Sequence, residues 1–220
     1  MKLDYKLGLV VHAIGLPDEK RRLLASIRNY MDRDWLDVAL IDEDMEDRAK
    51  VNVAAAKNKG IRKCLADNCD GIVCVDVDYL IPPGLFELCM ASEIQPHHLW
   101  VRRRDIQPGQ VNEYRWRDWL KLPIFGAEFK GTMECRGSCN FMSRENWLKV
   151  GGWDERAGVG WGGDDDVLHQ RIRQAGIETR VVDALPLVHV SHDIRPWGGV
   201  NARGQQNWQW HKEPQPNYLA

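Results

Sequence analysis

The chain has 220 residues and a formal net charge of −2, and its composition is 44% hydrophobic and 28% charged. This length suits one sizeable domain, and the composition is ordinary for a soluble globular protein. Because positive and negative charges nearly balance, no bulk attraction to nucleic acid or to a membrane surface is indicated. Partners therefore have to be inferred from local sites.

The N-terminal stretch MKLDYKLGLVVHAIGLPDEK carries an apolar run that is interrupted by His12 and followed by charged residues. A signal peptide would end in a small-residue cleavage site instead, and no membrane span is visible, so we expect a cytoplasmic protein. Six cysteines are scattered without paired CxxC motifs. They predict reduced, buried thiols, with a zinc site from Cys135 and Cys139 as the weaker alternative.

The first half of the chain alternates strand and helix patterns. In chain order, the expected elements are a strand at 7–13, a helix at 17–30, a strand at 35–42, a helix at 51–69 and a strand at 71–78. The prolines and glycine at 82–84 would end the last strand. This alternation predicts a parallel sheet with helices on its faces.

The second half is less regular. A strand is expected within HHLWVRRRDIQPG, residues 97–109, followed by a stretch rich in Trp and Arg up to residue 134. Further expected elements are a short helix at 143–155 that stops at Gly151 and Gly152, a helix at 164–176, and one or two strands at 178–190. The tail has little regular pattern, and we expect it to extend over the surface or to form a lid.

Two aspartates, Asp76 and Asp78, end the apolar strand that contains Ile72 to Val75. In open α/β sheets, ligands bind beyond the carboxyl ends of such strands. The two-residue spacing would put both carboxylates on one side of an extended chain, where they could share a cation and a polar ligand. The alternative is that the two acids only solvate the end of the strand.

Three consecutive aspartates, residues 164–166, lie in GWGGDDDVLHQRI at the expected start of a helix. One can cap the helix, and each neighbour gains roughly 0.3 to 1 kcal/mol from the helix dipole. Because successive helix residues point about 100° apart, at least one should project into the preceding turn. Close like charges raise one another's pKa, which suits a proton acceptor near neutral pH, although a simple capping cluster explains the pattern equally well.

Several other polar residues lie at the predicted strand ends. His189 and His192 lie in PLVHVSHD, and one neutral imidazole together with the two upstream carboxylates would make an open octahedral metal site. His12 ends the first strand and Lys57 lies on the second helix. Each of the two could contact a nucleotide. Each is explained equally well as an ordinary residue with no role in binding.

The combination of VDVD, RGSCNFMSRENWLKVGGWDE, GWGGDDDVLHQRI and LVHVSHD, in this order and spacing, resembles the catalytic domain of GT-A glycosyltransferases. It is most similar to the branch with the animal galactosyltransferases that build lactosamine and the related chondroitin-type enzymes. The likeness covers residues 7 to about 193. It implies an α/β GT-A (nucleotide-diphospho-sugar transferase) fold, with a mostly parallel central sheet flanked by helices and a Rossmann-like N-terminal half.

The resemblance also implies one domain over residues 1–220. Its parts would be a nucleotide-binding half at 1–96, an acceptor and catalytic half at 97–195, and an extended C-terminal tail or lid at 196–220.

Residue roles follow from the same resemblance. Asp78 would ligate Mn²⁺ or Mg²⁺, and Asp76 would hold the ribose or the metal shell of the nucleotide sugar. Asp165 falls on the catalytic base, and Asp164 on the acid that binds sugar hydroxyls. The metal-binding histidine falls on His189.

His192 is a credible substitute, because the spacing here differs by one residue. The implied nucleotide-binding residues also include His12, Asp42, Lys57 and Asn58. Trp161, with Gly162 and Gly163, would line the sugar site, and Trp153 would add a second aromatic face. Two departures weaken the match: the first strand ends in His-Ala-Ile rather than Pro-Phe-Arg, and Val53 replaces an arginine of the galactosyltransferases.

The implied function is metal-dependent, inverting transfer of a hexose or N-acetylhexosamine from a nucleotide sugar, expected to be UDP-linked, to a glycan hydroxyl. A nucleotidyltransferase of sugar phosphates is one alternative, but HAIGLPDEKR lacks the Gly-rich phosphate loop expected near the first strand. A non-catalytic sugar-binding module is another, favoured by ten tryptophans. No secretory stem or membrane anchor is seen, which fits a bacterial, phage or viral enzyme better than a Golgi one.

Overall fold

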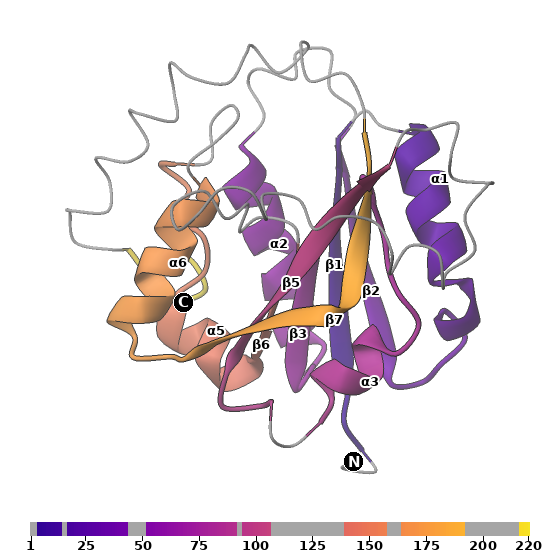
Figure 1. Ribbon diagram of the computed structural model, residues 1–220. Helices are drawn as coiled ribbons and strands as arrows, with labels where there is room; N and C mark the ends of the chain where they lie inside the picture. The colour runs from indigo at the N-terminus through magenta and orange to yellow at the C-terminus, as the bar shows by residue number, and fades with distance from the viewer. Residues whose placement is uncertain are drawn as a thin grey trace.

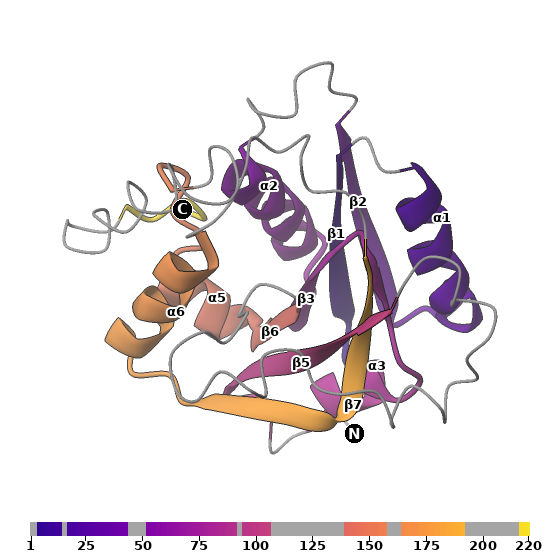
Figure 2. The same cartoon turned by 45° about the horizontal axis from the view of Figure 1, so that its top comes forward.

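The computed structural model describes residues 4–14, 17–43, 52–91, 94–106, 139–157, 164–191 and 216–220. In these ranges the chain forms one twisted sheet with helices on both faces (Figure 1). Helices α1 (Pro17–Ser26) and α3 (Leu85–Cys89) cover one face, and α2 (Val53–Ala66), α5 (Arg144–Val150) and α6 (Asp164–Gln174) cover the other. Figure 2 shows the same division after a 45° turn.

The N-terminal half has the predicted parallel arrangement. Strand β1 (Leu7–Ile14) lies between β2 (Leu36–Glu43) and β3 (Gly71–Asp76) and is parallel to both. Alternate side chains of β1 point to opposite faces, so Leu9 packs in the cluster that includes α1, and Val10 in the cluster that includes α2. Each face of the sheet therefore has its own hydrophobic core.

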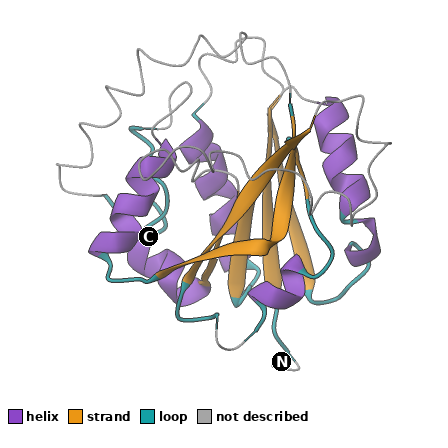
Figure 3. Cartoon of the chain, viewed as in Figure 1, coloured by secondary structure: helices purple, strands orange, loops and turns teal. Residues whose placement is uncertain are grey.

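Beyond β3 the sheet is mixed. The remaining strands are β4 (Tyr79–Leu80), β5 (His98–Ile106), β6 (Cys139–Ser143) and β7 (Thr179–Val190). The strand order is β2-β1-β3-β6-β5-β7-β4, in which β6 is antiparallel to both of its neighbours, β5 and β7 are parallel, and β4 is antiparallel to β7. The expected parallel sheet is thus the N-terminal part of a larger mixed sheet, as Figure 3 shows.

The structure differs from the sequence-based elements at several places, and it includes β4 and α3, where no element was predicted. Strand β3 ends at Asp76 and residues 77–78 form a turn, whereas the sequence predicted a strand through Asp78. The predicted helix at 17–30 ends at Ser26 and continues as a short 3-10 helix. Strand β6 was not predicted, because its residues are almost all buried and do not alternate, and Asn140 interrupts the apolar run that would mark a buried strand.

The connection after α5 has the predicted glycine stop. Gly151 ends the helix with φ = 75°, a left-handed conformation that glycine adopts without strain. The Ser143 hydroxyl caps the other end of α5 by accepting a hydrogen bond from the Asn146 backbone N–H. Trp147 and Trp153 then stack with ring centroids 5.1 Å apart and fill the core below α2.

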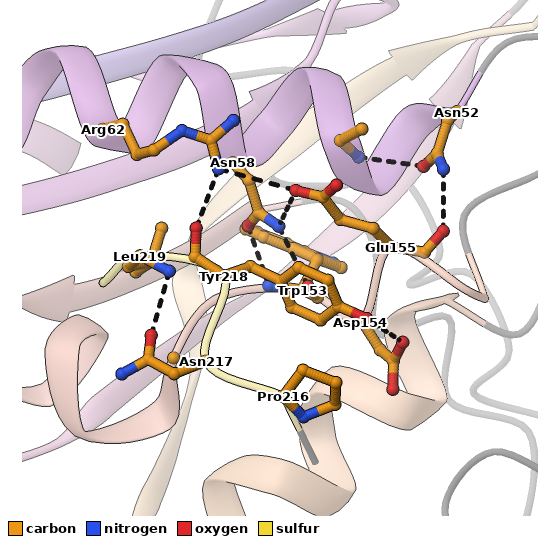
Figure 4. Close-up of polar contacts among 12 residues, drawn as sticks. Asn52, Asn58, Arg62, Trp153, Asp154, Glu155, Pro216, Asn217, Tyr218 and Leu219 are labelled. Atoms are coloured by element: carbon orange, nitrogen blue, oxygen red, sulfur yellow. Dashed lines mark hydrogen bonds and ion pairs between the residues drawn. The ribbon is translucent and has the colours of Figure 1, made fainter.

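The last five residues, 216–220, pack against the helices on the α2 face of the sheet (Figure 4). Tyr218 donates its backbone N–H to the Gly151 carbonyl at 2.9 Å, and its own carbonyl accepts from Arg62 at 2.8 Å. Leu219 is only 7% exposed. This end of the predicted tail is therefore packed down, and residues 196–215 lie outside the described ranges.

Within the described part of the chain, no helix is long and apolar enough to cross a bilayer. The described cysteines, Cys64, Cys69, Cys74, Cys89 and Cys139, are buried thiols, as the sequence predicts. Cys135, the other half of the alternative zinc site, lies outside the described residues.

Candidate active site

The two aspartates that follow β3 point to different partners. Because the chain turns at residues 77–78, Asp76 and Asp78 do not share one side of an extended strand as predicted. An Asp76 carboxylate oxygen lies 3.0 Å from the Lys57 ammonium nitrogen, and an Asp78 oxygen lies 3.1 Å from Nε2 of His189. The pair therefore forms two adjacent subsites at the carboxyl end of β3.

Lys57 is a buried cation at the centre of the first subsite. Its side chain is 4% exposed, and its nitrogen lies 3.9 Å from Asp164 and 3.8 Å from Asp165 as well as 3.0 Å from Asp76. It also lies 5.0 Å from the centre of the Trp153 ring. Burial opposes the charged form, but the three carboxylates hold the pKa of Lys57 well above its ordinary value. The lysine thus connects β3 with the start of α6.

The three aspartates of GWGGDDDVLHQRI all belong to the first turn of α6, which begins at Asp164, so none of them occupies the N-cap position predicted for one of them. Burial and then the neighbouring Asp164 raise the pKa of Asp165 well above its ordinary value; Asp76 and Asp166 add to this, and Lys57 opposes it. The pKa of Asp76 is raised to about 6, mainly by burial. The pKa of Asp165 therefore shifts in the predicted direction, but burial contributes more to the shift than the neighbouring carboxylates do.

His189 occupies the second subsite between two carboxylates. Its Nδ1 lies 2.8 Å from Asp105 and its Nε2 lies 3.1 Å from Asp78. Burial alone would lower the pKa of His189, but hydrogen bonding to Asp105 and Asp78 raises it to about 9. Asp105 was not among the predicted site residues, because its proximity to His189 depends on strand pairing that no local pattern reveals.

The Asp78 and His189 pair combines a carboxylate oxygen with an imidazole nitrogen, a donor set that suits Mn²⁺ and leaves coordination positions for other ligands. Within the described ranges, no group of three or more His, Cys, Asp or Glu side chains is arranged to hold a metal ion by itself. A bound ion would therefore draw further ligands from outside this pair.

His12 lies directly beside Asp76, since the two residues are partners in the pairing of β1 with β3. Burial, and then the nearby Lys57, lower the pKa of His12 to about 3, so the imidazole is neutral at physiological pH. Its Nε2 is buried and has no hydrogen-bond partner among the described residues. His12, which was predicted to bind the nucleotide, therefore lies at the site, and its Nε2 is available to hydrogen-bond a ligand.

Two predicted ligand contacts have structural roles. The Asn58 side chain donates to the Trp153 carbonyl at 2.9 Å and to Glu155 at 3.0 Å, and it accepts from the Trp153 N–H at 2.9 Å (Figure 4). Asn58 is fully buried and ties α2 to the segment after α5, and its predicted contact with the nucleotide stays a prediction. Trp153 is also fully buried, so the expected aromatic face for a sugar is not available there.

The remaining predicted residues are not placed. Trp161, Gly162, Gly163 and His192 lie outside the described residues. Asp42 is in β2, where its backbone pairs with Ala13 of β1, but its side chain lies outside the described part of the structure. Of the predicted site, the structure therefore brings together seven residues: His12, Lys57, Asp76, Asp78, Asp164, Asp165 and His189.

Comparison with known proteins gives an independent assignment. Residues 128–193 match the family model described as the N-terminal domain of galactosyltransferase. Mouse β-1,4-galactosyltransferase 4 is 31% identical over 166 residues, which are 73% of this chain and 42% of the mouse protein. The chain thus spans less than half the length of this curated relative.

Solved structures give the same fold. The catalytic domain of Drosophila β1,4-galactosyltransferase 7 matches 96% of this chain and 82% of its own, with a TM-score of 0.64 and 17% identity. GalNAc-T7 matches 96% of this chain and 48% of its own, with a TM-score of 0.66 and 15% identity. The chain therefore has the GT-A glycosyltransferase fold, and its sequence similarity confirms the resemblance to the galactosyltransferase group of these enzymes.

Proposed function

We propose that this chain is a metal-dependent, inverting glycosyltransferase that moves a hexose or N-acetylhexosamine from a UDP-sugar to a hydroxyl group of a glycan. The observation that carries the proposal is the convergence on Lys57 of Asp76, from the end of β3, with Asp164 and Asp165, from the first turn of α6. Next to this cluster, Asp78 in the turn after β3 contacts His189 of β7. Donor, base and metal-binding groups would then meet at the carboxyl edge of the parallel strands, where α/β sheets bind ligands.

Two of the solved relatives support the choice of donor and metal. A Drosophila β1,4-galactosyltransferase 7 variant was solved with manganese, UDP-Gal and xylobiose. GalNAc-T7 was solved with UDP, GalNAc and Mn²⁺. By similarity of fold, we assign a UDP-sugar donor, a glycan acceptor and Mn²⁺ to this chain.

Asp78 and His189 would hold the cation, and His192 is a further candidate ligand. When bound, a divalent cation would neutralise the charge that develops on the departing diphosphate. The nucleotide would lie against Asp76, His12 and Asp42.

Asp165 would act as the base. Its carboxylate accepts the proton of the acceptor hydroxyl while the acceptor oxygen forms a bond to the anomeric carbon and the bond to the nucleoside diphosphate breaks. Attack from the face opposite the leaving group inverts the anomeric centre. Asp164 would bind a sugar hydroxyl, and Trp161, Gly162 and Gly163 would shape the sugar pocket. Lys57 offsets the negative charge that these acids would otherwise impose on one another.

A panel of UDP-sugars with and without Mn²⁺ tests the reaction, with UDP release and glycan transfer as the readout. We expect Asp165→Asn to lower kcat by about 100-fold or more, with unchanged binding of UDP and Mn²⁺, because the amide cannot accept the proton. Asp166→Asn, one residue along the same turn, serves as the matched control and should lower kcat much less.

If Asp165→Asn transferred sugar at the wild-type rate, the assignment of Asp165 as the base would be wrong. Release of pyrophosphate rather than UDP would identify a nucleotidyltransferase instead. A glycan-binding protein whose thermal midpoint does not respond to UDP and Mn²⁺ would be a non-catalytic sugar-binding module.

A further inference from the structure

We infer that Asp105 is a positioning residue that fixes the ring orientation and tautomer of His189, so that Nε2 is preset to bind a divalent cation next to Asp78. The inference rests on the proposed metal site at Asp78 and His189. It adds a residue that lies in a different strand, β5, and that does not itself contact the cation.

The contact between Asp105 and His189 is short and well sheltered. Their side chains are 28% and 14% exposed, and the Asp105 oxygen lies 2.8 Å from Nδ1. An ionised carboxylate can only accept hydrogen bonds, so Nδ1 carries the hydrogen in this contact. Without a cation, Nε2 likewise donates to Asp78 at 3.1 Å; a divalent cation bound beside Asp78 would replace that hydrogen and take the Nε2 lone pair, while the Nδ1 hydrogen stays on Asp105.

The surroundings of the two carboxylates decide which one binds the cation. Asp105 lies 3.4 Å from the Arg103 guanidinium, which is itself held by the Tyr79 hydroxyl at 3.1 Å. A fixed positive charge beside Asp105 disfavours a second cation there. Asp78 instead follows Asp76 at the carboxyl edge of β3, where a ligand is expected. The structure therefore assigns the outer position to Asp105 and the ligand position to Asp78.

An irregularity in the pairing of β5 with β7 brings Asp105 to His189. Val101 lies opposite Val182, but Arg103 lies opposite Leu187, so β7 has three more residues than β5 between these pairs. The shift places Asp105 opposite His189. Because an odd shift moves a strand's side chains to the other face of the sheet, uninterrupted pairing would not offer the imidazole to this carboxylate.

The other neighbour of β7 completes the support. Tyr79 of β4 is paired with His189, and the two rings lie 5.3 Å apart at an angle of 43°. The imidazole is thus held by Asp105 at Nδ1 and by the Tyr79 ring beside it. A carboxylate behind a metal-binding histidine is a common outer partner, and its loss weakens metal binding about 10- to 100-fold.

The test measures Mn²⁺ binding to the intact chain without donor or acceptor. The loss of the electron paramagnetic resonance signal of free Mn²⁺ reports the bound fraction. We expect Asp105→Asn to weaken binding about 10- to 100-fold, because an amide can point its NH₂ group at Nδ1 and no longer selects one tautomer. Asp67→Asn makes the same chemical change at a residue with a 41% exposed side chain at the end of α2, and should bind Mn²⁺ like the wild type. Asp105→Glu, which keeps the carboxylate, should retain more affinity than Asp105→Asn.

A second readout separates positioning from a general loss of structure. In ¹⁵N-histidine spectra of the metal-free protein, recorded above the pKa of His189, the wild type should show the hydrogen on Nδ1, and added diamagnetic Zn²⁺ should bind Nε2. Asp105→Asn should show a mixture of tautomers, and a His189→Gln variant assigns the signals. Thermal unfolding of each variant shows whether it remains folded.

Equal Mn²⁺ affinity of wild type and Asp105→Asn, including no binding by either, would overturn the inference, as would an unchanged tautomer. The proposed function fails in a different way. If Mn²⁺ affinity depended on Asp105 but the protein transferred no sugar, the role of Asp105 would stand. The glycosyltransferase assignment would then be wrong.

Discussion

At the scale of single residues, Lys57 is the group on which the candidate site depends most. It is a buried ammonium that contacts carboxylates from two elements distant in sequence, Asp76 in β3 and the acids of α6. A buried charge is tolerated when it is paired, and removing one partner leaves the others uncompensated. Lys57 therefore controls both the geometry and the ionisation of the proposed base.

Replacing Lys57 by Met should shift the pH dependence of transfer. Burial, Asp164, Asp76 and Asp166 raise the pKa of Asp165, and Lys57 is the group that opposes them. Without the lysine the pKa rises further, and because the base must be ionised to accept a proton, the acid limb of the kcat/KM profile moves to higher pH. We expect a loss of roughly tenfold or more at pH 6 and a smaller loss at pH 8.

Lys59→Met, on an exposed position of the same helix, is the control and should keep the wild-type pH profile. An unchanged acid limb in folded Lys57→Met protein would contradict the role assigned to the lysine.

At the scale of elements, the C-terminal segment 216–220 fastens the parts of the structure that lie on the α2 face of the sheet. Arg171 of α6 donates to the Pro216 carbonyl at 2.6 Å, and the Tyr218 hydroxyl donates to Asp154 at 3.0 Å. Asp154 has a fully buried side chain that Arg156 also contacts at 2.6 Å. Burial raises the pKa of Asp154, but these hydrogen bonds hold it below its ordinary value.

Tyr218→Phe removes the hydrogen bond to Asp154 and leaves the ring in place. We expect the free energy of unfolding to fall by about 1 to 2 kcal/mol, because the lost bond is made to a buried carboxylate. Urea denaturation of the variant measures the loss. In an Asp154→Asn background the same substitution should cost less, and an equal cost in both backgrounds would mean that the hydroxyl does not act through Asp154.

At the scale of the whole molecule, the described part of the sheet is stabilised by hydrophobic clusters on both of its faces and by a buried polar link between its strands. His98 of β5 is fully buried, and its ring nitrogens lie 2.9 Å from the Asn140 side chain in β6 and 3.1 Å from the Thr179 hydroxyl in β7. Burial lowers the pKa of His98 to about 4, although the bond to Asn140 opposes the shift. The imidazole therefore holds three strands together in its neutral form.

This histidine should make stability depend on pH in acid. Between pH 6.5 and 4 the unfolded chain binds a proton at His98 that the folded chain does not bind, so the free energy of unfolding falls as the pH falls through this window. The contribution reaches about 3 kcal/mol. His98→Gln, which cannot titrate, should be less stable at pH 7 but lose less stability on acidification than the wild type. Chemical denaturation at several pH values measures both slopes, and equal slopes would contradict the prediction.

Much of the N-terminal half could be predicted from the sequence, because its signals are local. The apolar run before Asp76, the alanine-rich helix that carries Lys57 and the glycine stop at Gly151 each express a preference that a few adjacent residues decide. The acidic cluster at 164–166 could likewise be recognised from the sequence as three carboxylates at the start of a helix. These features predicted a site at the carboxyl edge of the sheet, and the structure brings Asp76, Lys57 and the acids of α6 together there.

Other features depend on contacts between distant parts of the chain. Strand β6 could not be predicted, because it neither alternates nor forms the continuous apolar run that marked the buried strand β3. Asn58 and Trp153 were read as ligand contacts, yet packing across about a hundred residues of sequence buries both. The two aspartates of VDVD were expected to act together, but the turn at 77–78 separates their partners.

The sequence by itself determined the residue types of the site and the order of the elements that carry them, because periodicity, turn residues and charge spacing are properties of short segments. Only the tertiary structure decided which groups meet: Lys57 with the acids of α6, and His189 with Asp105. These pairings depend on strand order, on a three-residue shift between β5 and β7, and on side-chain burial, all of which arise when distant segments pack together.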